Sequence, residues 1–333
     1  MSVQLTELGN EQRRQLIDVR QAFAAWRETA RKGNPGSLRW VTRKGAEYLY
    51  RKSQRSERSL GRRSPETEAI MKVHGQLRER RKKGQARLKS MARVNRALYL
   101  NRVPKEPSLI LRELDAAGLL GKHLFVIGTN ALYAYEARAG VLFESGLLAT
   151  NDFDLLWDAK DNLRLLVTGI SPDGVLGILR AADPSYSTAN DYGTRAQNAD
   201  GYFVDLFCPE VDPPAEKLSK NDLDPIAAEG IDWLVKAPKI EETVIGSDGM
   251  PLYLPCVDPR VFALHKLWLS KAPSRQAASR PRDRSQAHAV AVVAQAFLEL
   301  KFKDRALGFL PAEVRAGADE LSRIAKEYEK DGK

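Results

Sequence analysis

Cysteine is scarce in this chain of 333 residues, which contains only Cys208 and Cys256, far apart in sequence. A disulfide framework is therefore not expected, and a reducing, cytoplasmic setting fits best. The two cysteines and the four histidines show none of the spacings of a zinc site.

Several common signatures are also missing. No apolar run approaches the roughly 18–20 residues that cross a membrane, so we expect no membrane partner. The first residues lack the hydrophobic region of a secretory signal. The absence of G-x-x-x-x-G-K-[S/T] argues against a P-loop, and the absence of G-x-S-x-G argues against a serine hydrolase.

Positive charge is concentrated in one third of the chain. The whole sequence carries +10, yet residues 11–102 contain 26 Lys and Arg against 8 Asp and Glu, which gives +18 and leaves −8 for the rest. Such asymmetry favours a polyanionic partner, RNA above all, for the N-terminal third. Two other interpretations stay open: the charges are the solvated faces of long helices, or they dock on the acidic remainder.

The N-terminal third has mainly helical patterns. Apolar residues recur at spacings of three and four over residues 11–31, and Ser64-Pro65-Glu66 opens a helix that could run to about residue 99, with Gly84 as a candidate interruption. The remaining expectations are a hairpin or a strand-turn-helix at residues 38–50, an exposed loop at 51–63, and a boundary at Pro104 and Pro107.

The centre of the chain predicts strands that alternate with helices. A buried run at residues 124–127 ends in Gly128 and opens a helical pattern, and a second run contains Asp152 and Asp154. Further expectations are a turn at residues 158–162, a helix at 175–182, a hairpin of 194–198 and 201–208 around Asp200-Gly201, a loop at 209–230, and strands at 231–245 and 252–254. From Pro259 onwards the pattern is helical, with a basic loop at residues 271–284.

One group of residues predicts a site for a metal ion and a phosphate. Gly128 and Thr129 lie where a strand turns into a helix, and the free N–H groups and the helix dipole there favour a phosphate. Asp152 and Asp154 point the same way in a strand, and two like charges side by side usually need a bound cation. Asp205, within Y-F-V-D-L-F, adds a third acid. Three carboxylates on one sheet face suit Mg²⁺ or Mn²⁺, the requirement for in-line attack on phosphorus.

Each part of this group also has a plainer interpretation. Asp152 could be a turn residue and Asp154 a solvated edge residue, while Asp205 could be a sheet-end acid bonded to backbone. Gly128-Thr129 could be an ordinary tight turn between strand and helix. These residues occur along the chain in the order that the site requires, which argues against all of the plainer interpretations being true at once.

The residues resemble the nucleotidyltransferase fold of the polymerase-beta-like superfamily. The shared pattern is an apolar strand, glycine with a small residue, a helix, D-x-D in a strand, and a lone Asp in a later strand. More narrowly, the chain resembles bacterial nucleotidyltransferase-like proteins with an extra N-terminal region, in which a stretch like L-x-W-V-x-x-x-G-x-x-Y-L-Y, here residues 38–50, precedes the core. The resemblance covers roughly residues 38–300, most convincingly 121–208. One departure is Gly128-Thr129-Asn130, where the superfamily usually has Gly-Gly or Gly-Ser.

The resemblance implies an α/β (α+β) fold with a mixed-sheet core. We expect a basic, mainly helical region at residues 1–106, the nucleotidyltransferase core at 107–258 and a helical region at 259–333. The helical region would pack beside the site with Arg282-Asp283-Arg284, although Arg282 and Arg284 could equally be solvated.

The implied activity is transfer of a nucleoside monophosphate from an NTP to an acceptor hydroxyl, with release of pyrophosphate. Asp152, Asp154 and Asp205 would bind the metal ions, and Gly128, Thr129 and Asn130 would hold the nucleotide. Lys266 would reach the triphosphate, although a surface lysine is the plainer interpretation. RNA, such as a tRNA end, is the favoured acceptor, with a protein or small molecule open, and the competing hypothesis is a catalytically inert binding module on the same fold. The sequence does not select the nucleotide or the oligomeric state.

Overall fold

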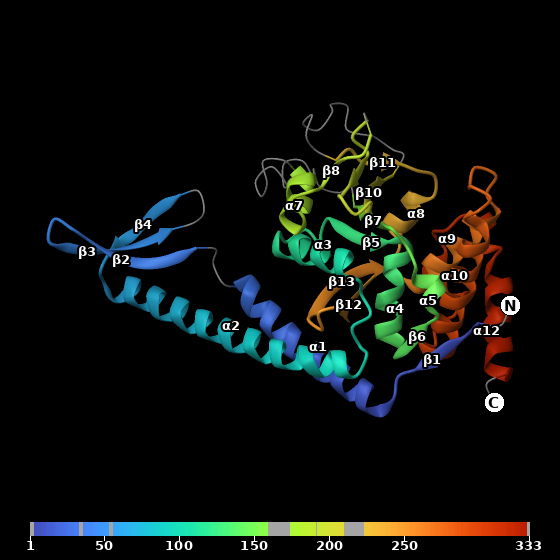
Figure 1. Ribbon diagram of the computed structural model, residues 1–333, viewed down its shortest axis with the longest axis horizontal. Helices are drawn as coiled ribbons and strands as arrows, with labels where there is room; N and C mark the ends of the chain where they lie inside the picture. The colour runs from blue at the N-terminus through green and yellow to red at the C-terminus, as the bar shows by residue number, and fades with distance from the viewer. Residues whose placement is uncertain are drawn as a thin grey trace. The chain divides into compact units, whose positions relative to one another are not determined.

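The computed structural model describes residues 3–32, 36–52, 56–158, 174–190, 192–209 and 223–331. Its chain divides into two compact units (Figure 1). The large unit comprises Met1–Arg13, Asn101–Asp248 and Leu252–Lys333, and the basic unit comprises Arg14–Leu100 and Gly249–Pro251. No helix within the described ranges is both long enough and apolar enough to span a bilayer.

An eight-stranded mixed sheet forms the centre of the large unit. Its order is β12-β13-β5-β7-β10-β9-β8, and β11 pairs with β10. The strands are β5 (Leu124–Ile127), β7 (Asp152–Trp157), β8 (Ser187–Thr188), β9 (Arg195–Gln197), β10 (Phe203–Cys208), β11 (Ile226–Ala227), β12 (Lys239–Ile245) and β13 (Pro251–Val257). Separately, β1 (Leu5–Glu7) pairs with β6 (Val141–Phe143). The predicted strands at residues 124–127 and around Asp152 and Asp154 are confirmed.

Helices pack around this sheet. They are α3 (Lys105–Ala116), α4 (Leu132–Ala139), α5 (Ser145–Leu148), α7 (Gly174–Ala182), α8 (Ile231–Lys236), α9 (Pro259–Lys271), α10 (Arg280–Val292), α11 (Ala312–Arg315) and α12 (Ala318–Asp331). Short 3₁₀ turns occupy Gly128–Ala131 and Arg305–Leu307, and a π-turn, Val293–Phe297, follows α10. Contacts join α9, α10 and α12 into one layer, and α4 packs against β12.

Buried apolar runs explain why β5 and β7 lie in the middle of the sheet. All four residues of β5 are buried, as are the last three of β7, which is typical of strands covered on both faces. β5 pairs antiparallel with β7, and β7 pairs parallel with β10. The architecture is an α+β fold around a mixed sheet, as the sequence predicts.

The basic unit combines two helices and a small sheet. Its elements are α1 (Asn10–Lys32), whose first turn belongs to the large unit, β2 (Ser37–Arg43), β3 (Ala46–Lys52), β4 (Glu57–Arg62) and α2 (Pro65–Ala97). Ser64 caps α2 in a reciprocal capping box with Thr67. A Cβ at Gly84 would lie 2.9 Å from the Trp26 ring, so this glycine lets the two helices approach closely without interrupting α2.

Four sequence predictions about elements are corrected. Residues 57–62, expected as loop, form edge strand β4, a place where polar residues are tolerated. In the expected loop at 209–230, residues 226–227 form β11. The strand expected from residue 231 begins as helix α8, because Ile231 and Leu234 are buried at helical spacing. Within the expected basic loop at 271–284, Pro281 opens α10 in its first turn.

Several expectations fall outside the described residues. Of the turn expected at residues 158–162, only Asp158 is described, and residues 210–222 of the expected loop are likewise not described. The expected hairpin of 194–198 and 201–208 is present as β9 and β10.

Candidate active site

The turn after β5 is shaped by Gly128. Its φ is 61°, in the left-handed region that glycine adopts without penalty, and a Cβ there would overlap Asp154 Oδ2. The backbone of the turn therefore lies directly against the carboxylate of β7. Glycine at this position serves both the turn conformation and the contact.

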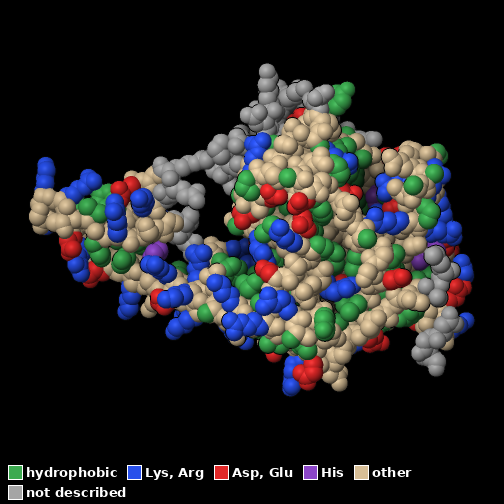
Figure 2. All heavy atoms as spheres, in the orientation of Figure 1, with side chains coloured by type: hydrophobic (Ala, Val, Ile, Leu, Met, Phe, Trp, Pro, Cys, Tyr) green, Lys and Arg blue, Asp and Glu red, His purple; other side chains and the backbone are tan. Residues whose placement is uncertain are grey.

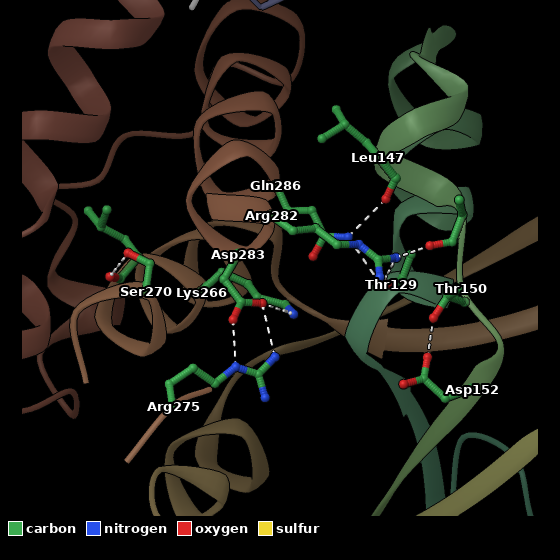
Figure 3. A network of polar contacts seen from close by, with 12 residues as sticks. Thr129, Leu147, Thr150, Asp152, Lys266, Ser270, Arg275, Arg282, Asp283 and Gln286 are labelled. Atoms are coloured by element: carbon green, nitrogen blue, oxygen red, sulfur yellow. Dashed lines mark hydrogen bonds and ion pairs between the residues drawn. The ribbon is translucent and has the colours of Figure 1, made fainter. Parts of the chain in front are cut away.

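The hydroxyl of Thr129 accepts two hydrogen bonds from α10 (Figure 3). Arg282 Nη2 and Gln286 Nε2 each lie 3.1 Å from Thr129 Oγ1. The two donors are four residues apart and so lie on the same face of the helix. Arg282 also donates to the carbonyl of Ala149, which ties α10 to the chain just before β7.

The orientation of the Gln286 amide is fixed by a carbonyl. Gln286 Nε2 lies 2.9 Å from the backbone oxygen of Leu147, and a carbonyl oxygen can only accept. The atom of the Gln286 amide that faces Leu147 must therefore be the nitrogen, and its second proton points to Thr129. Gln286 is fully buried, so this arrangement is held by packing as well.

Asp152 and Asp154 begin β7 and face the same side of the sheet. Thr150 donates a hydrogen bond to Asp152 Oδ1 (Figure 3). Burial and then the neighbouring Asp152 carboxylate raise the pKa of Asp154 to about 7, against the opposing effect of Lys266. Lys266 and Arg195 therefore offset only part of the cost of ionising Asp154.

Asp205 lies beside Asp154 on the neighbouring strand. The parallel register of β10 and β7 places the two residues opposite each other, and adjacent strands are about 4.8 Å apart. Asp205 is only 2% exposed, and Arg195 of β9 binds it with both nitrogens of one edge, Nε at 2.8 Å and Nη2 at 2.6 Å. Both oxygens of the third acid are therefore held by a guanidinium.

Lys266 is buried in α9 and bound to an acid of α10. Its Nζ lies 2.7 Å from Asp283 Oδ1, and Arg275 Nε lies 2.7 Å from Asp283 Oδ2. Burial opposes ionisation of Asp283, but these two cations hold its pKa below the usual value. Lys266 is close enough to lower the pKa of Asp154, so it contributes positive charge at the edge of the acids.

Asn130 supports β7 through its amide. Its Nδ2 donates to the backbone oxygen of Asp152 at 2.8 Å, and the hydroxyl of Tyr202 donates to the same oxygen at 3.1 Å. Within the described part of the chain, Asn130 Oδ1 and Gln286 Oε1 are buried without a hydrogen-bond partner. Two unsatisfied acceptors beside one turn are a feature that a bound ligand could satisfy.

The structure thus brings together six of the residues singled out from the sequence: Gly128, Thr129, Asn130, Asp152, Asp154 and Asp205. The seventh, Lys266, lies near Asp154 but is engaged by Asp283. No group of three or more His, Cys, Asp or Glu is arranged to hold a metal ion among the described residues. The three-carboxylate metal site stays a prediction.

Sequence reasoning missed Arg195 and Gln286. The hairpin signal around Asp200-Gly201 pointed to a partner for Asp205 on the preceding strand, but a turn centred on those two residues would pair Arg195 with Leu206. The loop in the structure has one more residue on its N-terminal side. The register of the two strands is therefore shifted by one residue, and Arg195 pairs with Asp205. Gln286 carries no signal in the sequence, because its partner Thr129 lies 157 residues away along the chain.

Comparison with known proteins identifies a family. A family model described as nucleotidyltransferase matches residues 106–310. The matched segment contains the turn at Gly128, the three acids and the α9–α10 pair. No curated protein and no solved structure matches the chain.

Proposed function

This chain belongs to the nucleotidyltransferase family, and we propose that it transfers a nucleoside monophosphate from an NTP to an acceptor hydroxyl, with release of pyrophosphate. The observation that carries the proposal is the hydroxyl of Thr129. Both of its lone pairs accept from donors that cannot accept in return, so its single proton must point elsewhere. A hydroxyl fixed as a donor at a glycine turn suits a phosphate oxygen.

The acids form the other half of the proposed site. Asp152 and Asp154 are paired carboxylates, and burial followed by the Asp152 charge raises the pKa of Asp154. Hard oxygen donors of this kind fit Mg²⁺ or Mn²⁺. A bound divalent ion would supply charge neutralisation at the phosphates. Asp205 fits the same role only if Arg195 releases it.

The chain's own side chains would then position the substrate. Thr129 and the N–H groups after Gly128 would grip the triphosphate, and Arg282 and Gln286 would keep the Thr129 hydroxyl oriented. Lys266 would add long-range positive charge to the site. Positioning and electrostatic stabilisation account for most of the rate in phosphoryl chemistry of this type.

RNA is the acceptor that the charge distribution favours. The basic unit, residues 14–100 and 249–251, carries 24 Lys and Arg against 7 Asp and Glu. A net charge of this size attracts a polyanion. A protein or small-molecule hydroxyl is the alternative acceptor.

A labelling experiment tests the activity. The full chain is incubated with Mg²⁺ or Mn²⁺ and each α-labelled NTP, alone and with total RNA. We expect label to appear on RNA, and to disappear with Asp154→Asn and with Thr129→Val. Asp200→Asn, which changes an exposed acid in the β9–β10 loop, is the matched control and should keep full activity.

One observation favours a second candidate, a catalytically inert binding module. Arg195 binds both oxygens of Asp205, so the carboxylate that the family fold would need for a metal ion is already occupied by a guanidinium. For a module, no label is transferred under any combination of NTP, metal and acceptor. If Arg195→Gln restored transfer of label, the ion pair of Arg195 with Asp205 would be identified as the cause of inactivity.

A further inference from the structure

The small sheet of the basic unit has two chemically different faces. In a strand, successive side chains alternate between faces, and the register pairs Trp40 with Leu49 and Tyr48 with Val41. Leu49 is fully buried, and a Cβ on Gly61, its partner on β4, would lie 3.7 Å from Thr67 at the start of α2. The face with Trp40 and Leu49 is therefore the one that packs on α2.

The opposite face is polar, basic and aromatic. We call it the tyrosine face and define it by six side chains that alternation and register place together: Arg39, Arg43, Tyr48, Tyr50, Lys52 and Arg62. The four basic side chains are exposed, and the two tyrosines are half-buried. Lys and Arg side chains are prominent over β2, β3 and β4 in the space-filling view (Figure 2).

The two tyrosines occupy the central strand. Tyr48 and Tyr50 are two residues apart on β3, so their rings are separated by roughly 7 Å along the strand. Tyr48 lies opposite Arg62 of β4, and Arg43 Cζ lies 5.1 Å from the Tyr50 ring centroid. Aromatic rings and guanidinium planes on an open sheet are surfaces on which unpaired bases stack.

The charge of this face matches a phosphate backbone. Arg39 pairs with Glu57 at 2.6 Å, and Arg43, Lys52 and Arg62 add three further cations to the face beside the rings. The basic unit as a whole has a net charge of +17. Cations that border stackable rings favour a ligand with both phosphates and exposed bases, rather than a duplex, whose bases are stacked inside.

We propose that the tyrosine face binds single-stranded RNA, with one base on Tyr48, one on Tyr50 or the Arg43 guanidinium above it, and phosphates on Lys52 and Arg62. The choice of RNA over other polyanions rests on the proposed function, in which RNA is the favoured acceptor. The binding itself uses none of the side chains of the candidate active site.

The test measures binding without catalysis. The full chain is titrated into fluorescein-labelled oligo(U) of about 12 nucleotides, a length within the range one such site covers, in EDTA and without NTP, and anisotropy is recorded. We expect Tyr48→Ala/Tyr50→Ala to weaken binding about ten-fold or more, because each stacked base contributes substantially. Tyr48→Phe/Tyr50→Phe keeps the rings and should bind within about two-fold of wild type, since stacking needs no hydroxyl.

Matched variants separate this face from general charge and from misfolding. Tyr99→Ala/Tyr192→Ala removes two exposed tyrosines that are not on the face and should leave binding unchanged. Lys52→Gln/Arg62→Gln removes the two proposed phosphate contacts, so it should weaken binding and lower the slope of log K against log salt by about 1.4. Lys326→Gln/Lys330→Gln on α12 removes the same charge elsewhere and should have neither effect. Circular dichroism and the melting curve verify that each variant is folded.

Four results would overturn the proposal: unchanged affinity of Tyr48→Ala/Tyr50→Ala for oligo(U), equal affinity for duplex RNA, equal affinity for oligo(dT), or binding to anionic phospholipid vesicles that the same tyrosines control. None of them bears on nucleotidyl transfer, which the label assay scores with Mg²⁺ present. Conversely, a chain that binds oligo(U) through the tyrosines but transfers no label would refute the transferase proposal alone.

Discussion

The hydroxyl of Thr129 offers the most specific test at the scale of single residues. Gln286→Glu replaces an amide donor with a carboxylate, which would accept the Thr129 proton and turn it away from a bound phosphate. We expect the affinity for a non-hydrolysable NTP analogue to fall about ten-fold or more, the value of one hydrogen bond to a charged group. Isothermal titration calorimetry measures this directly.

A double-mutant cycle provides the control. Thr129→Val removes the hydroxyl with little change of shape and should weaken NTP binding by itself. If Gln286 acts through that hydroxyl, Gln286→Glu adds little further loss in the Thr129→Val background, because the two changes remove one interaction. Additive losses would mean that Gln286 does not act by orienting Thr129.

The raised pKa of Asp154 predicts that ionisation of this carboxyl group destabilises the folded chain. Its pKa is about 7 in the folded chain, against an ordinary value of 3.8 for an aspartic acid side chain. The unfolded chain therefore ionises this acid first, so stability is lost as pH rises from about 4 to 7 and the full penalty remains above pH 7. Asp154→Asn, which is never charged, should melt about 2 °C or more above wild type at pH 8, and this gain should shrink towards pH 4.

Differential scanning calorimetry across that pH range checks the prediction. Asp200→Asn, an exposed acid in the β9–β10 loop, should leave the melting temperature unchanged at both ends. A gain for Asp154→Asn that is the same at pH 4.5 and pH 8 would contradict the assignment of the raised pKa to this carboxyl group.

The sequence predicted which residues of the candidate site lie close together better than it predicted their hydrogen-bond partners. Gly128, Thr129 and the three acids could be found because each is a chemically distinctive residue inside an apolar run. Arg195 could not be assigned to Asp205, since a turn one residue too short changes every cross-strand pair. The buried pairing of Lys266 with Asp283 was also out of reach, because it joins two helices whose contact no periodicity predicts.

At the scale of elements, the turn between β5 and α4 is the part that a small change should disrupt most. Gly128→Ala introduces a Cβ that overlaps Asp154 and sits at a φ of 61°. Gly118→Ala is the matched control, with a φ of 73° and nothing within 4 Å of the added Cβ. Both should lose about 1 kcal/mol for the left-handed conformation.

Only Gly128→Ala should lose more stability than that and also lose NTP affinity, because only there must the carboxylate move. Urea unfolding and calorimetric titration measure the two quantities. Equal stability losses in the two variants, with NTP affinity kept in both, would show that the close contact with Asp154 has no structural or functional weight.

Long periodic elements were predicted with nearly correct bounds, and short ones were not. The helix from Ser64 carries its own capping residues, and it forms as predicted because these signals are local in the sequence. Strand β4 and helix α8 depend on neighbours instead: β4 is held by pairing with β3, and α8 by burial of Ile231 and Leu234. Tertiary contacts decide such short segments, and the local sequence does not contain them.

At the scale of the whole molecule, the two proposed activities belong to different units of the chain. Asp154→Asn should abolish transfer of label while leaving the affinity for oligo(U) within about two-fold, since the removed charge is not on the tyrosine face. Tyr48→Ala/Tyr50→Ala should reduce RNA affinity and keep affinity for the NTP analogue.

Both affinities can be measured on the same preparations by anisotropy and calorimetry. The opposite pattern, in which Asp154→Asn lowers RNA affinity strongly, would mean that the acids themselves contact the nucleic acid.

The parallel pairing of β7 with β10 has a consequence for how the protein acquires its chemistry. Asp154 and Asp205 become neighbours only after the chain between them has crossed over and β10 has docked beside β7. Such distant pairings form slowly during refolding, whereas the hydrogen bonds within α1 and within α2 join residues that are close in sequence. Far-ultraviolet ellipticity should therefore recover before nucleotide affinity does, which makes nucleotide affinity a late marker of native assembly.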